Sequence, residues 1–401
     1  MEPAKRQELR RQYRRALLDD VVPFWLHHSL DREYGGYLTC LTRDGSVYSG
    51  DKAVWLQGRE VWLFSKLYNT VEARAEWLEA ARLGYRFLVG HGFDADGRMF
   101  FSTTRDGRPL RKRRYLFSET FAAIACAQYA RASGDGAAWD LARRVYNMTV
   151  DLHRDPQTRP DLAATVPPKV YPATRQSKAH AMPMILIATS QEMREVADEP
   201  QFTAVIDEAI DEILTDFMHR DERVLLENVG PHGERLDLPA GRLTLPGHAI
   251  ETSWFLLREA LHRRDASLQE SALDILRWSL EWGWDEEHGG LLYYVDIEGL
   301  PPEQLEWDMK LWWPHTEALY ALLLASYLTG DPFWDDWYWR MHSWTFAHFP
   351  DPLHGEWFGY LHRDGSLANP AKGSMWKGAF HVPRALLYCM QLLERTDWAA
   401  T

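Results

Sequence analysis

The sequence contains long segments in which apolar side chains recur with the period of an α-helix. After Ser118 and Glu119 the spacing is i, i+3, i+4, i+7, i+8, and the same spacing returns after Pro314 and His315. Other segments carry an apolar stripe along one face: Trp77, Ala81, Tyr85 and Leu88 form one stripe, and Ile206, Ile210, Ile213 and Phe217 form another. The pattern predicts α-helices that come in pairs.

A turn motif repeats between the predicted helix pairs. It starts with an aspartate, reaches a glycine a few residues later, continues through aromatic residues and ends in a second turn such as Arg43-Asp44-Gly45. Asp-Gly and Gly-Gly steps are typical of hairpin turns, so each copy predicts a short β-hairpin. Clear copies begin at Asp31, Asp94, Asp285 and Asp351, with weaker copies near Asp155 and Asp221, so the interval is about 61 to 66 residues.

Six hairpins that alternate with six helix pairs predict an all-α fold, the (α/α)6 barrel. In this toroid a ring of inner helices lies inside a ring of outer helices, and the β-hairpins lie at one face. A single hydrophobic core usually stops growing at about 250–300 residues. A repeated ring explains how all 401 residues form one catalytic domain, residues 1–401. An open helical solenoid is the competing architecture.

Ionisable side chains recur in the first turns of the predicted inner helices. Those turns would meet at one mouth of a ring, where we expect a pocket. The carboxylates there have a simple alternative role, because acidic side chains complement the helix dipole. Histidine gains nothing at such a position, since a protonated ring opposes the dipole. The helices are predicted to begin near Gly58, Ser118, Lys178, Gly247, Pro314 and Lys377; the carboxylates are Glu119, Glu251 and Glu317, and the histidines are His180, His248, His315 and His381.

Composition and charge narrow the class of protein. The formal net charge of −13 does not favour binding to nucleic acid. The 19 Trp, 17 Tyr and 16 Phe can fill a large core or form flat walls on which sugar rings stack. The charged N-terminal segment lacks the apolar core of a signal peptide, and no apolar run approaches the roughly 20 residues that span a bilayer. Three widely spaced cysteines predict neither a disulfide framework nor a Cys-x-x-Cys zinc site, so we expect a cytoplasmic protein with no membrane partner.

Three kinds of chemistry fit the predicted mouth. His248 and Glu251, three residues apart, suit a metal ion, but the sequence has no second such pair. Glu119 and Glu317 suit the acid and base of a glycoside hydrolase, although the histidines then have no role. Proton transfer at carbon requires two groups that titrate near neutral pH, one on each face of a planar enolate, which suits two histidines.

Six long strings in the chain resemble the N-acylglucosamine 2-epimerase family. They are residues 54–59, 226–228, 246–254, 304–315, 355–360 and 380–384. The resemblance runs from about Val21 to Gln391 and implies an (α/α)6 barrel, in agreement with the repeat. It also implies an isomerase that interconverts N-acetyl-D-glucosamine and N-acetyl-D-mannosamine. Related enzymes epimerise cellobiose or isomerise mannose to fructose in similar sites.

The resemblance implies roles for individual residues. His248 and His381 are expected to be the acid/base pair, which moves a proton at C2 of the ring-opened sugar through a cis-enolate. Arg59 is expected to hold the carbonyl or enolate oxygen, and Glu251 to orient His248 from one turn on. The residues expected to line the sugar are Trp55, Tyr115, His180, Arg242, Trp313, Glu317, Trp376 and Lys377.

No glycine-rich nucleotide-binding motif follows a predicted strand, and the metal signal is weak, so we expect chemistry that needs no cofactor and no metal ion. Members of the family are often stimulated by ATP, so the resemblance implies ATP as an activator. The partners expected are a small amino sugar and a second copy of the chain in a homodimer. A related sugar epimerase or isomerase, a glycoside hydrolase and a non-catalytic binding protein remain as alternative functions, the last because one family member is also called renin-binding protein.

Overall fold

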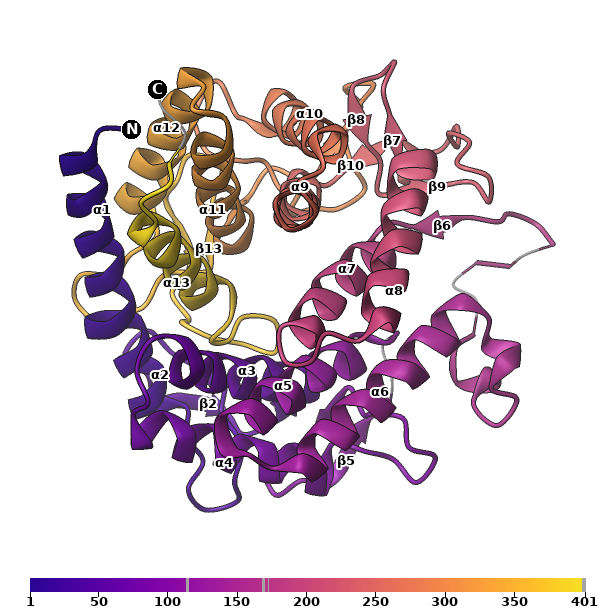
Figure 1. Cartoon of the computed structure of the whole chain (residues 1–401), viewed down its shortest axis with the longest axis vertical. Coiled ribbons are helices and arrows are strands. Elements are labelled where there is room, and N and C mark those ends of the chain that lie inside the picture. The colour runs from indigo at the N-terminus through magenta and orange to yellow at the C-terminus, as the bar shows by residue number, and fades with distance from the viewer. Residues whose placement is uncertain (113–114, 168–169, 172, 399–401) are drawn as a thin grey trace.

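A computed structural model describes residues 1–112, 115–167, 170–171 and 173–398, and its helices form a closed double ring (Figure 1). The inner helices are α3 (Val54–Thr70), α5 (Phe117–Ser133), α7 (Ala181–Arg194), α9 (Pro246–Arg263), α11 (Trp312–Thr329) and α13 (His381–Glu394). The outer helices are α1 (Pro3–Arg15), α4 (Ala75–His91), α6 (Gly136–Arg154), α8 (Pro200–Glu212), α10 (Ala266–Gly283) and α12 (Pro332–His348). The predicted barrel is confirmed, although residues 399–401 of the predicted domain lie outside the described residues.

Burial explains which helices form the inner ring. In α11, 16 of 18 residues are buried, whereas in its outer partner α12 only 5 of 17 are. A helix that is apolar all round must be covered on every side, whereas a helix with one apolar stripe remains at the surface. The apolar spacing that predicts helices therefore also sorts them into two layers.

The ring closes where the two ends of the chain meet. Trp62 of α3 contacts Phe380, next to α13, and Tyr388 within α13, with ring centroids 5.2 and 6.3 Å apart. Helix α1, which continues through residues 16–21 into α2 (Val22–His28), packs against α13 and serves as its outer partner. The sixth helix pair thus combines the first and last helices, which excludes an open solenoid (Figure 1).

The turns from inner to outer helices have a simple local cause. Helices α5 and α11 each end at a glycine with positive φ, Gly134 and Gly330, and that conformation is accessible to glycine without strain. The next residue in each case, Asp135 or Asp331, accepts a hydrogen bond of 2.9 Å from a backbone N–H in the first turn of the outer helix. Each turn needs only these two residues.

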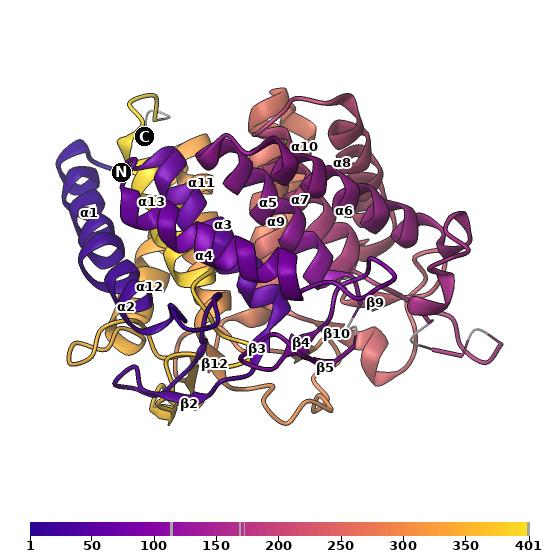
Figure 2. The ribbon, with the colours of Figure 1, turned by 90° about the horizontal axis from the view of Figure 1, so that it is seen from below.

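Short antiparallel strands gather at one end of the helices (Figure 2). The pairs are β1 (Cys40–Leu41) with β2 (Val47–Ser49), β6 (Lys178–Ala179) with β9 (Asn228–Val229), β7 (Met218–His219) with β8 (Val224–Leu225), and β10 (Leu243–Thr244) with β11 (Val295–Asp296). Two sheets have three strands, β3 (Lys52–Ala53), β4 (Ser102–Thr103) and β5 (Pro109–Arg111), and β12 (Lys310–Leu311), β13 (Tyr360–Leu361) and β14 (Leu367–Asn369). The predicted β-hairpins at one face are present.

One of the weaker repeat copies was predicted wrongly. The copy near Asp221 forms the β7–β8 hairpin, but the segment after Asp155 forms two single 3₁₀ turns, Pro156–Thr158 and Ala163–Thr165. Proline at 156 and 160 explains the difference, since proline has no N–H to give to a strand ladder.

The motif aspartates join neighbouring repeats through buried ion pairs. Asp31 is 1% exposed, contacts Lys52 Nζ at 2.9 Å and accepts two hydrogen bonds from Arg105 of the next repeat at 2.9 and 3.0 Å. The same arrangement recurs at Asp285 with Lys310 and Arg363, and at Asp351 with Lys372 and Arg43. Since Arg43 belongs to the first repeat and Asp351 to the last, the third pair spans the ring closure.

Three predicted helix starts differ from the structure. The first inner helix begins at Val54, four residues before Gly58. The third begins at Ala181 instead of Lys178, and the last at His381 instead of Lys377. Gly58 lies inside α3, where an added Cβ would be 2.9 Å from the backbone carbonyl of Phe121 in α5. This glycine therefore allows close approach of two inner helices and does not mark a helix boundary.

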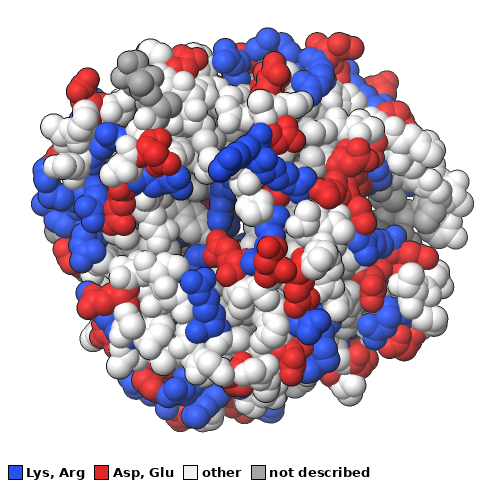
Figure 3. Space-filling view, in the orientation of Figure 1, with Lys and Arg blue, Asp and Glu red and all other residues white. Residues whose placement is uncertain are grey.

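The face of the barrel shown in Figure 3 has acidic and basic side chains interspersed across it. None of the described helices is both long enough and apolar enough to cross a membrane.

Candidate active site

Every inner helix contributes to a cavity of about 760 Å³ at the hairpin end of the barrel. The contributing side chains lie in the first two turns of each helix, so the predicted convergence at one mouth is present. They include Trp55 and Arg59 of α3, Phe117 and Phe121 of α5, Met184 and Ile185 of α7, His248 and Glu251 of α9, Trp312 and Trp313 of α11, and His381 of α13. This volume lies within the usual range for small-molecule sites.

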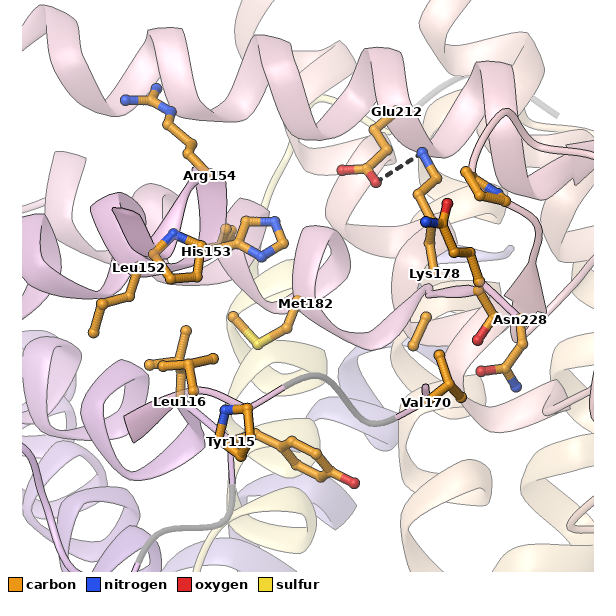
Figure 4. Close-up of a pocket in the computed structure, with 18 of the residues that line it drawn as sticks. Tyr115, Leu116, Leu152, His153, Arg154, Val170, Lys178, Met182, Glu212 and Asn228 are labelled. Carbon is orange, nitrogen blue, oxygen red and sulfur yellow. Dashed lines mark ion pairs between the residues drawn. The ribbon is translucent and has the colours of Figure 1, made fainter. Parts of the chain in front are cut away.

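A second, larger cavity of about 1260 Å³ lies between α6, α8 and the described residues 156–167 and 175–178 (Figure 4). Two ion pairs lie in its lining, Lys178 with Glu212 at 3.2 Å and Arg154 with Glu208 at 2.7 Å. Neither His248 nor His381 lines it, so the smaller cavity is the candidate active site.

The imidazole of His248 is held by Glu227, in the segment between β8 and β9. Its Nδ1 lies 3.1 Å from both carboxylate oxygens of Glu227. Burial acts to lower the pKa of His248, but the negative charge of Glu227 and the hydrogen bond outweigh it and raise that pKa above its usual value. This shift favours the protonated form of His248 more than in an ordinary histidine.

His381 is also held by a carboxylate, but two guanidinium groups lie close to it. Its Nδ1 lies 2.7 Å from Glu317 Oε1, and Nη2 of Arg384 contacts that same oxygen at 2.7 Å. Burial, reinforced by the guanidinium groups of Arg59 and Arg384, lowers the pKa of His381 well below its usual value. This histidine therefore favours its neutral form.

Both histidines lie beside one indole ring. The ring centroid of Trp313 lies 5.2 Å from that of His248 and 5.7 Å from that of His381. Since each histidine uses Nδ1 for its carboxylate, Nε2 is the nitrogen left for a molecule in the cavity. A protonated and a neutral imidazole on two sides of one site are suited to proton removal and proton return.

Arg59 presents a cation to the same cavity. Its guanidinium carbon lies 4.4, 4.1 and 4.6 Å from the ring centroids of Trp55, Phe121 and Phe380, and its Nε has no hydrogen-bond partner among the described residues. Burial lowers the pKa of Arg59 to about 9, so the group stays charged at neutral pH. A buried cation with an unused donor is suited to holding a negative oxygen.

Of the twelve residues proposed from the sequence, eight line this cavity. They are Trp55, Arg59, Tyr115, His248, Glu251, Trp313, Trp376 and His381. Glu251, however, does not contact His248 as expected, because its carboxylate accepts a hydrogen bond from Arg384 at 2.6 Å. Glu227 takes the expected place of Glu251 beside His248.

The other four expected lining residues lie behind or beside the cavity wall. Glu317 supports His381, and His180 is buried with its Nε2 3.0 Å from the Thr252 hydroxyl. Arg242 contacts Asp296 at 3.0 Å. Lys377 is 1% exposed and donates a hydrogen bond of 2.7 Å to Glu356. A buried ionised group needs a partner, and these partners turn the side chains away from the cavity.

His315 and Glu119 are structural. Nδ1 of His315 donates to the Leu311 carbonyl at 2.6 Å, and its Nε2 accepts from the Leu291 N–H at 2.9 Å. Burial lowers the pKa of His315 to about 3, so it stays neutral. Glu119 is 1% exposed and is paired with Arg98 at 2.6 Å, away from the cavity.

Several residues of the site were not singled out from the sequence. Glu227 and Arg384 lie inside two of the strings that resemble the family, so a signal for them existed. Tyr293, Tyr294 and Tyr360 line the cavity from the hairpins, where only the fold shows their position.

Two groups of side chains have the donor atoms of a metal site, each group within 4.8 Å: His180, Glu227 and His248, and Glu251, Glu317 and His381. In the second group Arg384 already supplies a cation to both carboxylates. In the first group the short contact is the one between Glu227 and His248. Measuring the activity with and without EDTA tests whether a metal ion takes part.

Comparisons with known proteins point to one family. The family model described as N-acylglucosamine 2-epimerase matches residues 36–385. The bovine N-acylglucosamine 2-epimerase is 42% identical over 386 residues, which cover 94% of this chain and 89% of the relative. The human N-acylglucosamine 2-epimerase is 39% identical over 383 residues, which cover 94% of this chain and 88% of the relative.

Solved structures show the same fold at lower identity. A cellobiose 2-epimerase from Spirochaeta thermophila superposes with a TM-score of 0.83 at 24% identity, covering 98% of both chains. A D-mannose isomerase superposes with a TM-score of 0.82 at 17% identity, covering 95% of this chain and 97% of the other.

Proposed function

This chain belongs to the N-acylglucosamine 2-epimerase family, and we propose that it interconverts N-acetyl-D-glucosamine and N-acetyl-D-mannosamine. The observation that carries the proposal is the pair formed by His248 and His381, which line one cavity with opposite charge preference beside the cation of Arg59. Such a pair suits inversion at a carbon next to a carbonyl, where one face loses a proton and the other gains one.

The reaction begins with the open-chain sugar, because only this form has a C1 carbonyl that makes the C2 proton acidic. The neutral His381 removes that proton through Nε2. The C–H electron pair becomes the C1–C2 double bond, and the carbonyl electron pair moves to O1. Arg59 stabilises the negative O1, and Glu317 and Arg384 hold the imidazole of His381 in place.

His248 then returns a proton to the opposite face of the cis-enolate. Its positive charge is balanced by Glu227, which raises the pKa of His248 and favours the protonated form that this step needs. The enolate electrons form the new C2–H bond, and the carbonyl is restored. In the reverse direction the two histidines exchange roles. The sequence of steps consumes no cofactor.

Other members of the family suggest alternative substrates, since the fold neighbours include a cellobiose epimerase and a mannose isomerase. A glycoside hydrolase is less well supported. Of the two carboxylates that suit it, Glu119 is paired with Arg98 and Glu317 with Arg384, and neither lines the cavity. A hydrolase requires a carboxylic acid beside the scissile bond, and the lining carboxylates of Glu227 and Glu251 are paired with His248 and Arg384.

We further propose a cytoplasmic homodimer that needs no cofactor and is activated by ATP. The three cysteines are buried and free, which suits a reducing compartment. Dimerisation and ATP activation rest on the family resemblance alone, so light scattering and an ATP titration of the initial rate test them directly.

The test of the main proposal is proton NMR of N-acetyl-D-mannosamine with the purified protein in D₂O, with EDTA, with and without ATP. Formation of N-acetyl-D-glucosamine carrying deuterium at C2 is expected. Conversion of mannose or cellobiose instead would keep the mechanism but change the substrate. No exchange in any tube, with ATP and without EDTA, would exclude the proposed activity and favour a binding protein.

A further inference from the structure

The two sides of the cavity have different chemistry. One side, here called the α5–α7 wall, consists of Phe117 and Phe121 of α5 and Ala181, Met184 and Ile185 of α7. The opposite side, here called the tyrosine wall, consists of Tyr293, Tyr294 and Tyr360 beside Trp312 and Trp313. The first wall offers apolar surface, whereas the second offers phenol hydroxyls on flat rings.

The α5–α7 wall has little capacity for hydrogen bonding. Among the lining residues of α5, Ser118 has a polar side chain, but its hydroxyl already donates a hydrogen bond of 3.1 Å to the Phe100 carbonyl. A sugar hydroxyl held against this wall would leave water without gaining a partner, which costs free energy.

The order of the helices sets the orientation of the reacting atoms. His248 comes from α9 and His381 from α13, and α11 lies between these helices, so α5 faces α11 across the ring (Figure 1). A planar enolate between the two imidazoles therefore has one edge toward α11 and the other toward α5, and Arg59 of α3 lies beside that second edge.

An N-acylhexosamine in open-chain form has only one apolar part. Carbons C3 to C6 each carry a hydroxyl, whereas the acyl group on the C2 nitrogen ends in a methyl. With O1 on Arg59 and C2 between the histidines, the acyl group and the C3–C6 chain must leave C2 in different directions. Matching chemistry assigns the hydroxyls to the tyrosine wall and the methyl to the α5–α7 wall.

We infer that the α5–α7 wall is the subsite for the N-acyl group and that it accepts acyl chains longer than acetyl. The inference rests on the proposed epimerase function. Tyr115 lines both the active-site cavity and the second cavity, so a longer acyl chain would extend from this wall toward Tyr115. Figure 4 shows Tyr115 on the same side of that second cavity as the apolar side chains of Leu116 and Met182.

The experiment compares kcat/KM for N-acetyl-, N-propanoyl- and N-butanoyl-D-mannosamine, measured as C2 deuterium incorporation by NMR. The unmodified protein is expected to process all three. Its kcat/KM should rise by up to about fourfold per added methylene, because that is the gain expected from burying one CH₂ group. Ala181→Val narrows the wall and is expected to reduce the butanoyl-to-acetyl ratio about tenfold.

Tyr360→Phe is the matched control on the tyrosine wall. It is expected to lower kcat/KM for the three substrates by the same factor, so the ratio stays unchanged. Met184→Ala supplies a second variant in case Ala181→Val folds poorly, because it widens the wall and is expected to raise the ratio.

The outcomes separate the inference from the function on which it rests. If the protein epimerises N-acetyl-D-mannosamine but Ala181→Val and Met184→Ala leave the ratio unchanged while Tyr360→Phe alters it, the acyl group binds elsewhere and the inference is wrong. If none of the acylmannosamines exchanges at C2, the epimerase function fails and the inference fails with it.

Discussion

Two buried charged side chains at opposite ends of the barrel differ in how completely they are paired. At the end away from the hairpins, Glu192 accepts hydrogen bonds from Trp62, Gln128 and Tyr388 at 2.8 to 3.1 Å and pairs with Lys66. At the hairpin end, Arg59 Nε has no partner among the described residues. A fully paired network stabilises the fold, whereas unused donors beside a cavity are available to a ligand.

We therefore expect the hairpin end to determine catalysis and the other end to determine the stability of the fold. Substitutions at the hairpin end are expected to change catalysis and leave the fold intact, and substitutions at the other end should do the reverse.

The largest effect is expected from His381→Asn or His248→Asn. Each removes one of the two proton-transfer groups, so we expect kcat to fall by about 10²–10⁴. Thermal unfolding followed by circular dichroism should show a nearly unchanged Tm. Retention of more than about a tenth of the original rate by either variant would contradict the two-histidine mechanism.

The second prediction concerns the closed end. Glu192→Gln removes the charge that pairs with Lys66, and we expect a loss of about 2–3 kcal/mol in the free energy of unfolding, measured with urea. The turnover of the remaining folded protein should be normal. The Lys66 charge and the hydrogen bonds lower the pKa of the Glu192 carboxyl, although burial opposes them, so this stabilisation is present above about pH 4.5 and disappears as the pH falls toward 2.

The third prediction tests the carboxylate beside His248. Because Glu227 raises the pKa of His248, activity that needs the protonated ring is lost only as the pH rises through that raised value. Glu227→Gln removes the negative charge, so the alkaline limb of the kcat/KM profile should move to lower pH, with about a tenfold loss of kcat/KM on that limb. Glu251→Gln provides the comparison, and an equal shift of the same limb in that variant would argue against Glu227 as the partner.

The smallest effect is expected at the ring closure. Arg43→Ala removes the hydrogen bonds of 2.7 and 3.0 Å to Asp351, but Arg43 is 39% exposed and Lys372 still pairs with Asp351. We expect a loss of about 0.5 kcal/mol in urea unfolding and unchanged kcat. Arg363→Ala, which removes the corresponding contact to Asp285 within the ring, is the matched control.

Most of the fold was accessible from the sequence because its causes are local. The apolar spacing along α5 and α11 and the Asp-Gly turns each act over a few residues, and the repeat interval multiplies them around the ring. The repeat interval alone does not determine each hairpin. The segment after Asp155 contains prolines and forms single 3₁₀ turns where the repeat predicts a hairpin.

The candidate site was accessible only in part. The helix starts placed Arg59, His248 and His381 at one mouth. His315 occupies an equivalent position but turns to the Leu311 carbonyl, and Lys377 turns to Glu356. Position along a helix does not fix which partner a side chain reaches, so the predicted set contained both lining and buried residues.

The sequence by itself determined the paired helices, the hairpins and the chemical groups gathered at one end of the barrel. Only the tertiary structure decided that Glu227, 21 residues away, holds His248, while Glu251, one turn away, binds Arg384. The physical reason is that helical periodicity depends on neighbouring residues, whereas a buried charge takes the partner that lies nearest in space.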